Sequence, residues 1–215
     1  MLTLRAFVDV PYSGLEALER WWPVAPAAPG DRMFLAGDRT EAQAGLFVAL
    51  IAIDRLTEPL STRQVVVDEL LAHEWLGTSG GLLLADSATG VTIEPGCCCG
   101  VEDWWDWRRA FDDPSQVSLG HDPGPVVERR GAAFRVWQDG GPPLDLGHGI
   151  GPYIDLSAGD LVALLRGVQR DLIGFRTVLD RWARATGLGE RGEALVRTLD
   201  EQLHLTAALD LPSGW

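Results

Sequence analysis

The sequence predicts an α+β fold in which a mainly antiparallel sheet packs against a C-terminal helical hairpin. Short β-rich segments separated by turn residues fill most of the chain, and two long segments with helical apolar spacing close it. Strands joined by tight turns pair antiparallel, and helices gathered at one end distinguish α+β from α/β proteins. We therefore expect one domain over residues 1–215, with a sheet-rich part at 1–156 and the hairpin at 157–211.

The N-terminal segments alternate apolar runs with turn residues. Leu2–Val10 is rich in Leu, Phe and Val and ends at Pro11, which predicts a strand, and a short helix is expected near Leu15–Trp22. Gly45–Ile53 is apolar almost throughout and predicts a buried strand, whereas Gln64–Leu76 fits a strand and a helix equally well.

Four shorter segments complete the expected sheet. Leu82–Leu84 and Val91–Ile93 are separated by the turn signal Thr89-Gly90, which predicts a hairpin. Pro125–Glu128 and Ala133–Gln138 are two further expected strands, joined near a glycine. Most of the sheet should therefore be antiparallel.

Two amphipathic helices are expected at the C-terminal end. Ser157 and Asp160 have the spacing of a capping box, and a long helix follows that closes near Gly187. A second helix is expected over about Gly189–Leu209, before Pro212. The apolar positions of the first helix recur at steps of three and four residues: Leu161, Leu164, Leu165, Val168, Leu172, Phe175, Leu179 and Trp182.

The charge of the chain restricts its partners. With 31 acidic and 18 basic residues, the net charge of −13 repels phosphate backbones and anionic lipid, so neither nucleic acid nor a membrane is expected as a partner. The same charge favours a basic protein partner. Ala44–Ile53, the most apolar stretch, is too short to span a bilayer, and no basic leader precedes an apolar run, so we expect a cytoplasmic protein. No cofactor is expected.

A glycine-flanked triple cysteine, Gly96–Gly100, opens into a tryptophan-rich segment that predicts an amphipathic helix. Arg108 falls within the apolar stripe of that helix, so it should pair with a carboxylate or stack on a tryptophan. The aromatic set could form core or an interface, and its candidate binding residues are Trp104, Trp105, Trp107, Arg108 and Trp137.

The three cysteines allow two interpretations. As structural residues, at least two of Cys97, Cys98 and Cys99 should be buried and inert, with no histidine within hydrogen-bonding reach. As catalytic residues, they would use His121 as base and Asp122 as its orienting carboxylate. Three consecutive cysteines do not easily share one ion and no second cysteine cluster is present, so no metal site is expected.

The motif from Gly96 to Trp104, followed by Leu119–Pro123, Arg135–Trp137 and Gly167–Leu172, resembles a family of actinobacterial proteins to which no activity is assigned. In its size, acidity and α+β pattern the chain is also similar to immunity proteins of bacterial toxin systems. The leading expectation is a non-enzymatic acidic binding protein, an immunity or antitoxin-type partner of a basic effector. The alternatives are a cysteine-dependent enzyme or thiol sensor using the three cysteines with His121, and a small-molecule binder with a Trp-lined pocket.

Overall fold

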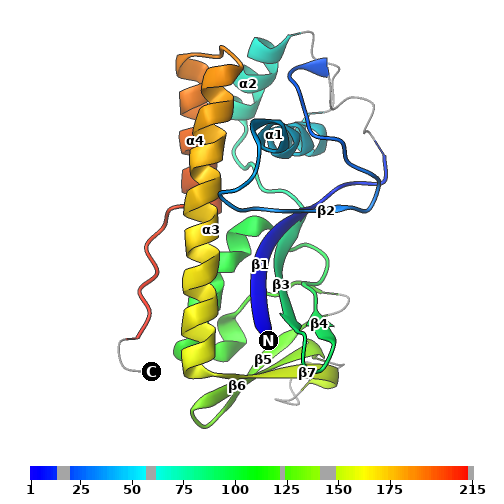
Figure 1. Cartoon of the computed structure of the whole chain (residues 1–215), viewed down its shortest axis with the longest axis vertical. Coiled ribbons are helices and arrows are strands. Elements are labelled where there is room, and N and C mark those ends of the chain that lie inside the picture. Colours follow the sequence, from blue (N-terminus) through cyan, green and yellow to red (C-terminus); the bar gives the residue numbers. More distant parts are fainter. Residues whose placement is uncertain (14–19, 57–61, 122–123, 141–148, 213–215) are drawn as a thin grey trace. The chain divides into compact units, whose positions relative to one another are not determined.

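The computed structural model describes residues 1–13, 20–56, 62–121, 124–140 and 149–212 (Figure 1). Its strands form two sheets, with the orders β2-β1-β3-β4 and β5-β6-β7, and the pairings β3–β4, β5–β6 and β6–β7 are antiparallel. The elements are β1 (Leu2–Asp9), β2 (Arg32–Phe34), α1 (Glu41–Arg55), α2 (Arg63–Ala72), β3 (Gly80–Asp86), β4 (Val91–Ile93), the 3₁₀ helices η2 (Val101–Phe111) and η3 (Pro114–Gln116), β5 (Val126–Arg130), β6 (Ala133–Asp139), β7 (Ile150–Ser157), α3 (Ala158–Ala185) and α4 (Glu190–Leu203). The predicted α+β class, with antiparallel sheets and a C-terminal pair of helices, is confirmed.

The chain divides into two compact units. Unit 1 comprises residues 1–7, 79–169 and 208–215, and unit 2 comprises residues 8–78 and 170–207. The division therefore falls within β1 and within α3.

Unit 1 contains the sheet β5-β6-β7, most of β1, the strands β3 and β4, and the first part of α3. In the second sheet, Val136 faces Val127 on one side and Ile154 on the other, and these three side chains are buried because alternate residues of a strand point to the same face. The helix η2 contacts β3 and buries Trp104. Residues 161, 165 and 168 of α3 are also buried within this unit.

Unit 2 is built from β2, α1, α2, the second part of α3 and α4. The helices α2 and α4 contact each other (Figure 1). Phe47 of α1 meets Phe175 of α3 edge-on at 5.2 Å, and Trp22 meets Trp182 in the same manner, also at 5.2 Å. The Trp22 indole donates a hydrogen bond of 2.7 Å to the carbonyl of Gly45. Aromatic packing thus fixes α1 against α3.

One predicted strand is wrong: Gly45–Ile53 lies within helix α1. Residues 44–52 are all buried, so this helix shows no polar face from which a helical period could be recognised. Its start is a capping box, in which the Gln43 amide nitrogen donates to Thr40 Oγ1 and the Thr40 amide nitrogen donates to Gln43 Oε1.

The other elements agree with the sequence analysis except for β2, η3 and β7, which were not predicted, and the end of α4. The first strand, the β3–β4 hairpin, β5, β6 and the long helix α3 are confirmed, and the ambiguous segment is the helix α2. The capping box at Ser157 is confirmed by hydrogen bonds in both directions with Asp160. The second helix ends at Leu203, before the left-handed His204, and β7 was not predicted. The expected helix near Leu15–Trp22 falls mostly on residues outside the described ranges.

Candidate functional site

The cysteine loop is held on both sides by backbone hydrogen bonds within unit 1. Cys97 and His121 form an antiparallel bridge, in which the Cys97 amide donates to the His121 carbonyl at 2.6 Å and the His121 amide donates to the Cys97 carbonyl at 3.1 Å. On the other side, the Gly80 amide donates to the Cys99 carbonyl at 3.1 Å. The backbones that carry Cys97 and His121 are therefore fixed side by side, although 24 positions separate them in the sequence.

Cys98 brings its sulfur close to that of Cys97. Adjacent residues of an extended strand point to opposite faces, but Cys98 has a φ of 67°, in the left-handed region that non-glycine residues seldom adopt. The Sγ atoms of Cys98 and Cys97 are 3.7 Å apart, and both side chains are exposed. His121 is exposed as well, and one of its ring nitrogens and the two sulfurs all lie within 4.8 Å of one another.

Cys99 has a different environment. It is buried, and burial together with the neighbouring Asp103 carboxylate raises the pKa of its thiol to about 12. Asp103 accepts hydrogen bonds from this thiol and from the Gly100 amide, the latter at 3.0 Å, and burial raises the pKa of its carboxyl. Cys99 is therefore an uncharged packing residue, whereas Cys97 and Cys98 are available to reagents.

These positions correct the structural interpretation of the cysteines. The expectation that at least two are buried is wrong, because only Cys99 is. The structure places a ring nitrogen of His121 within 4.8 Å of the sulfurs of Cys97 and Cys98 and leaves Cys99 out of the group. Asp122, the expected orienting carboxylate, lies outside the described residues.

The tryptophans of η2 are divided between core and surface. Four of its five buried positions recur at steps of three, as expected for a 3₁₀ helix with three residues per turn: Val101, Trp104, Trp107 and Ala110; the fifth is Phe111. Trp104 and Trp107 are thus core residues of unit 1, while Trp105 is only partly buried. The predicted amphipathic helix exists, but its type is 3₁₀.

Arg108 both stacks on a tryptophan and pairs with a carboxylate, the two arrangements expected from the sequence. Its guanidinium lies 3.3 Å from the centroid of the Trp105 ring, and its Nη1 lies 3.6 Å from Asp106 Oδ1. Nη1 also donates to the Trp105 carbonyl at 2.8 Å. The Trp105 indole in turn donates to the carbonyl of Ala208 at 3.3 Å.

Trp137 belongs to a polar and aromatic group on the sheet β5-β6-β7. Its indole donates to Glu128 Oε2 at 3.0 Å, and its ring centroid is 4.8 Å from that of Tyr153. Arg135 stacks on Tyr153 at 3.7 Å and donates two hydrogen bonds to Asp155, which lowers the pKa of that carboxyl. Sequence reasoning placed Arg135 on an expected strand but missed its partners Tyr153 and Asp155 because β7 was not predicted.

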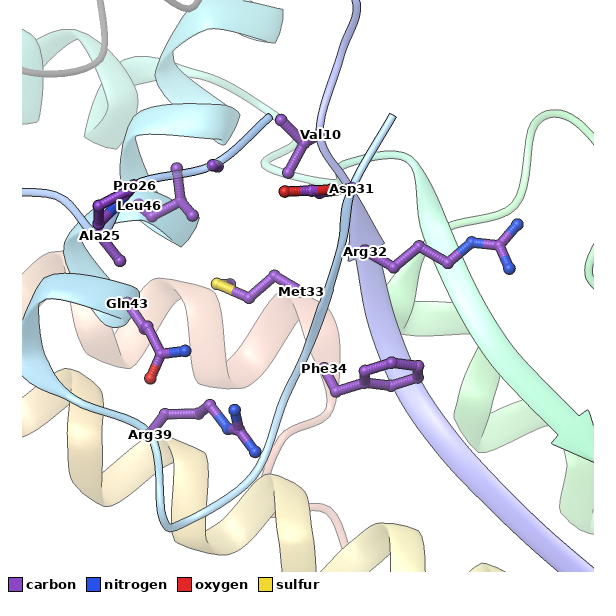
Figure 2. Close-up of a pocket in the computed structure, with 11 residues that line it drawn as sticks. Val10, Ala25, Pro26, Asp31, Arg32, Met33, Phe34, Arg39, Gln43 and Leu46 are labelled. Carbon is purple, nitrogen blue, oxygen red and sulfur yellow. The ribbon is translucent and has the colours of Figure 1, made fainter. Parts of the chain in front are cut away.

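Unit 2 holds a separate pocket with a volume of about 140 Å³ (Figure 2). The side chains of Met33 and Gln43 project toward its centre, and Arg39 also lines it. Arg39 Nε is buried and has no hydrogen-bond partner within the described ranges. None of the described residues that line this pocket is a tryptophan, cysteine or histidine, so it contains no candidate residue from the sequence analysis.

No protein-family model, curated protein or solved structure matches the chain. The resemblance to an actinobacterial family therefore stays a prediction. Among the described residues, no helix combines the length and apolar character that a bilayer crossing requires.

Proposed function

We propose that the protein is a thiol sensor whose reactive group is the pair Cys97 and Cys98, assisted by His121. The observation that carries this proposal is the 3.7 Å separation of two exposed sulfurs on a loop that hydrogen bonds fix beside the histidine. A protonated imidazole near a thiol favours the thiolate, and a neutral imidazole accepts the thiol proton. His121, with a ring nitrogen within 4.8 Å of both sulfurs, is the group placed to take either part.

The proposed reaction is oxidation of the pair by hydrogen peroxide. One thiolate attacks a peroxide oxygen, the O–O bond breaks, and a sulfenic acid and hydroxide form; the hydroxide takes a proton to become water. The second thiol then attacks the sulfenic sulfur, a sulfur–sulfur bond forms, and the hydroxyl group leaves with the thiol proton as a second water. In sum, one peroxide and two thiols give one disulfide and two waters.

A disulfide between adjacent residues suits a reversible sensor. Adjacent Cα atoms are about 3.8 Å apart across a trans peptide, below the usual range of about 4.4–6.8 Å for bridged cysteines. The bond would therefore be strained, and strained disulfides are readily reduced. The thiols also lie on an exposed loop and do not line the pocket of Figure 2, which favours a sensor over an enzyme with an enclosed substrate site.

The experiment is a thiol count during peroxide treatment. We expect the reduced chain to lose two of its three thiols and to regain both with a dithiol reductant. Cys99→Ser should lose two thiols at the rate of the parent protein. Cys97→Ser and Cys98→Ser should instead stop at a sulfenic acid, trapped by a 1,3-dione reagent. Loss of no thiols, or loss of two in Cys98→Ser, would contradict the proposal.

A second candidate function is the acidic binding protein expected from the sequence. It is supported by the net charge of −13, which favours encounter with a basic protein, including a toxin effector. In this proposal the chain is a cytoplasmic immunity or antitoxin-type partner. The test is purification of the native protein from its source at low and high ionic strength. A basic protein retained at low salt and lost at high salt supports it, and a chain that elutes alone in both contradicts it.

A further inference from the structure

The Cys97, Cys98 and His121 side chains also have the geometry of a metal site. Two sulfurs bound to one zinc ion at about 2.3 Å with a tetrahedral angle are about 3.8 Å apart. The observed Sγ–Sγ separation of 3.7 Å is close to that value. A histidine nitrogen on the same ion would lie about 3.5 Å from each sulfur. In the structure, a ring nitrogen of His121 and the two sulfurs lie within 4.8 Å of one another. Zinc binding would therefore require the exposed imidazole to rotate toward the two sulfurs.

The donor set selects the kind of ion. Two thiolates and one imidazole are soft and borderline ligands, which favour zinc, whereas Mg²⁺ and Ca²⁺ prefer oxygen. The two thiolates neutralise the charge of a divalent ion, and the net charge of −13 attracts cations to the chain. Three protein ligands leave a fourth position for water or an external ligand.

The backbone explains why two cysteines contribute and not three. The hydrogen bonds between Cys97 and His121 hold two ligand-bearing segments together before any ion binds. The left-handed conformation of Cys98 places its sulfur beside that of Cys97. Cys99 is buried and hydrogen-bonded to Asp103, so it is not a ligand. The sequence-based objection to three adjacent ligands therefore does not apply to this pair.

We propose that the reduced protein binds one Zn²⁺ ion through Cys97 Sγ, Cys98 Sγ and a ring nitrogen of His121, and that oxidation of the pair releases the ion. The binding step needs only the three side chains; the release step rests on the thiol-sensor function proposed above. The release balances as zinc dithiolate plus one peroxide and two protons, giving the disulfide, Zn²⁺ and two waters. A zinc-bound thiolate pair is also held in the arrangement from which the disulfide forms.

The binding experiment uses the full chain, reduced and stripped of metal by a chelator, in the absence of oxidant. Calorimetric titration with Zn²⁺ should give one ion per chain, and Co²⁺ should give the charge-transfer absorption of thiolate ligands. Cys97→Ser and Cys98→Ser should each weaken Zn²⁺ binding by at least about 100-fold, and His121→Ala by at least about tenfold, since even outer-shell changes reach about 10–100-fold. His73→Ala, at an exposed histidine of unit 2, and Cys99→Ser should bind as the parent does.

The outcomes separate this inference from the sensor proposal. No Zn²⁺ uptake by the reduced parent, or equal affinity in His121→Ala, would overturn the metal site whatever the peroxide reaction shows. One bound Zn²⁺ that stays bound during peroxide treatment would overturn the release step. Each variant is first compared with the parent by far-ultraviolet circular dichroism, and His121→Gln repeats the histidine test with a side chain closer in size.

Discussion

Gly120 lies next to His121, and replacing it by alanine tests how the Cys97 and His121 segments are held together. Gly120 has a φ of 78°, and a Cβ atom added to it would lie 2.5 Å from the Cys97 carbonyl oxygen and 2.8 Å from the Gly96 carbonyl. These atoms are backbone, so Gly120→Ala must move the two segments apart. Gly90 has nearly the same conformation, with a φ of 74°, but its added Cβ would meet nothing within 4 Å.

Comparing Gly90→Ala with Gly120→Ala separates the conformational cost of a left-handed alanine from the steric cost of the added Cβ atom. A non-glycine residue in the left-handed region costs about 1 kcal/mol, so Gly90→Ala should lower the free energy of unfolding by about that amount. Gly120→Ala adds the loss of the two hydrogen bonds between Cys97 and His121, at about 1 kcal/mol each, for a total near 3 kcal/mol.

The measurement is guanidinium unfolding followed by circular dichroism, with both variants and the parent at one pH. We expect Gly120→Ala to be about 2 kcal/mol less stable than Gly90→Ala, the worth of two backbone hydrogen bonds. Peroxide oxidation of Gly120→Ala should also slow, since its histidine is displaced from the thiols. Equal stability of the two variants would refute the close approach of Gly120 to the cysteine loop.

Three further predictions concern the core, an ion pair and the buried thiol. Phe47→Ala should lower the free energy of unfolding in urea by about 3–5 kcal/mol, because its ring is fully buried; a loss below about 1 kcal/mol would contradict this. Arg135→Met should raise the pKa of Asp155 in an NMR titration. In the parent this carboxyl has a lowered pKa, so its stabilising contribution is full above the ordinary value of 3.8 and is lost as the pH falls through the folded-state pKa; an unchanged pKa in the variant would argue against the pairing. Iodoacetamide near neutral pH should leave Cys99 unmodified while the two exposed thiols react, since Cys99 is buried and burial raises the pKa of its thiol to about 12; peptide mapping that finds Cys99 labelled first would be inconsistent with this.

The helices that sequence reasoning predicted are those with one polar face. The helix α3 has buried positions at steps of three and four residues, and this period is visible without any tertiary information. The helix α1 is buried on most sides, so its apolar run fits strand and helix alike. The spacing of Thr40 and Gln43 was a local signal that would have identified its start.

The strand β7 and the site depend on pairing between distant segments. Ile150–Ser157 contains Gly151 and Pro152, which argue against a central strand but are tolerated at a sheet edge, where β7 lies. The approach of His121 to Cys97 comes from a backbone bridge, and the left-handed conformation of Cys98 has no sequence signature. The residue types of the site were therefore predictable, while the choice of two cysteines from three was not.

The most direct test of the sensor is a peptide map of the chain after one equivalent of hydrogen peroxide, read by mass spectrometry. The proposed chemistry predicts a peptide that has lost two hydrogens through a Cys97–Cys98 bond, with the Cys99 thiol intact and both thiols restored by a dithiol reductant. A bond that includes Cys99, or sulfinic acid at Cys97 or Cys98 without any disulfide, would contradict the central claim that these two adjacent thiols act as a pair.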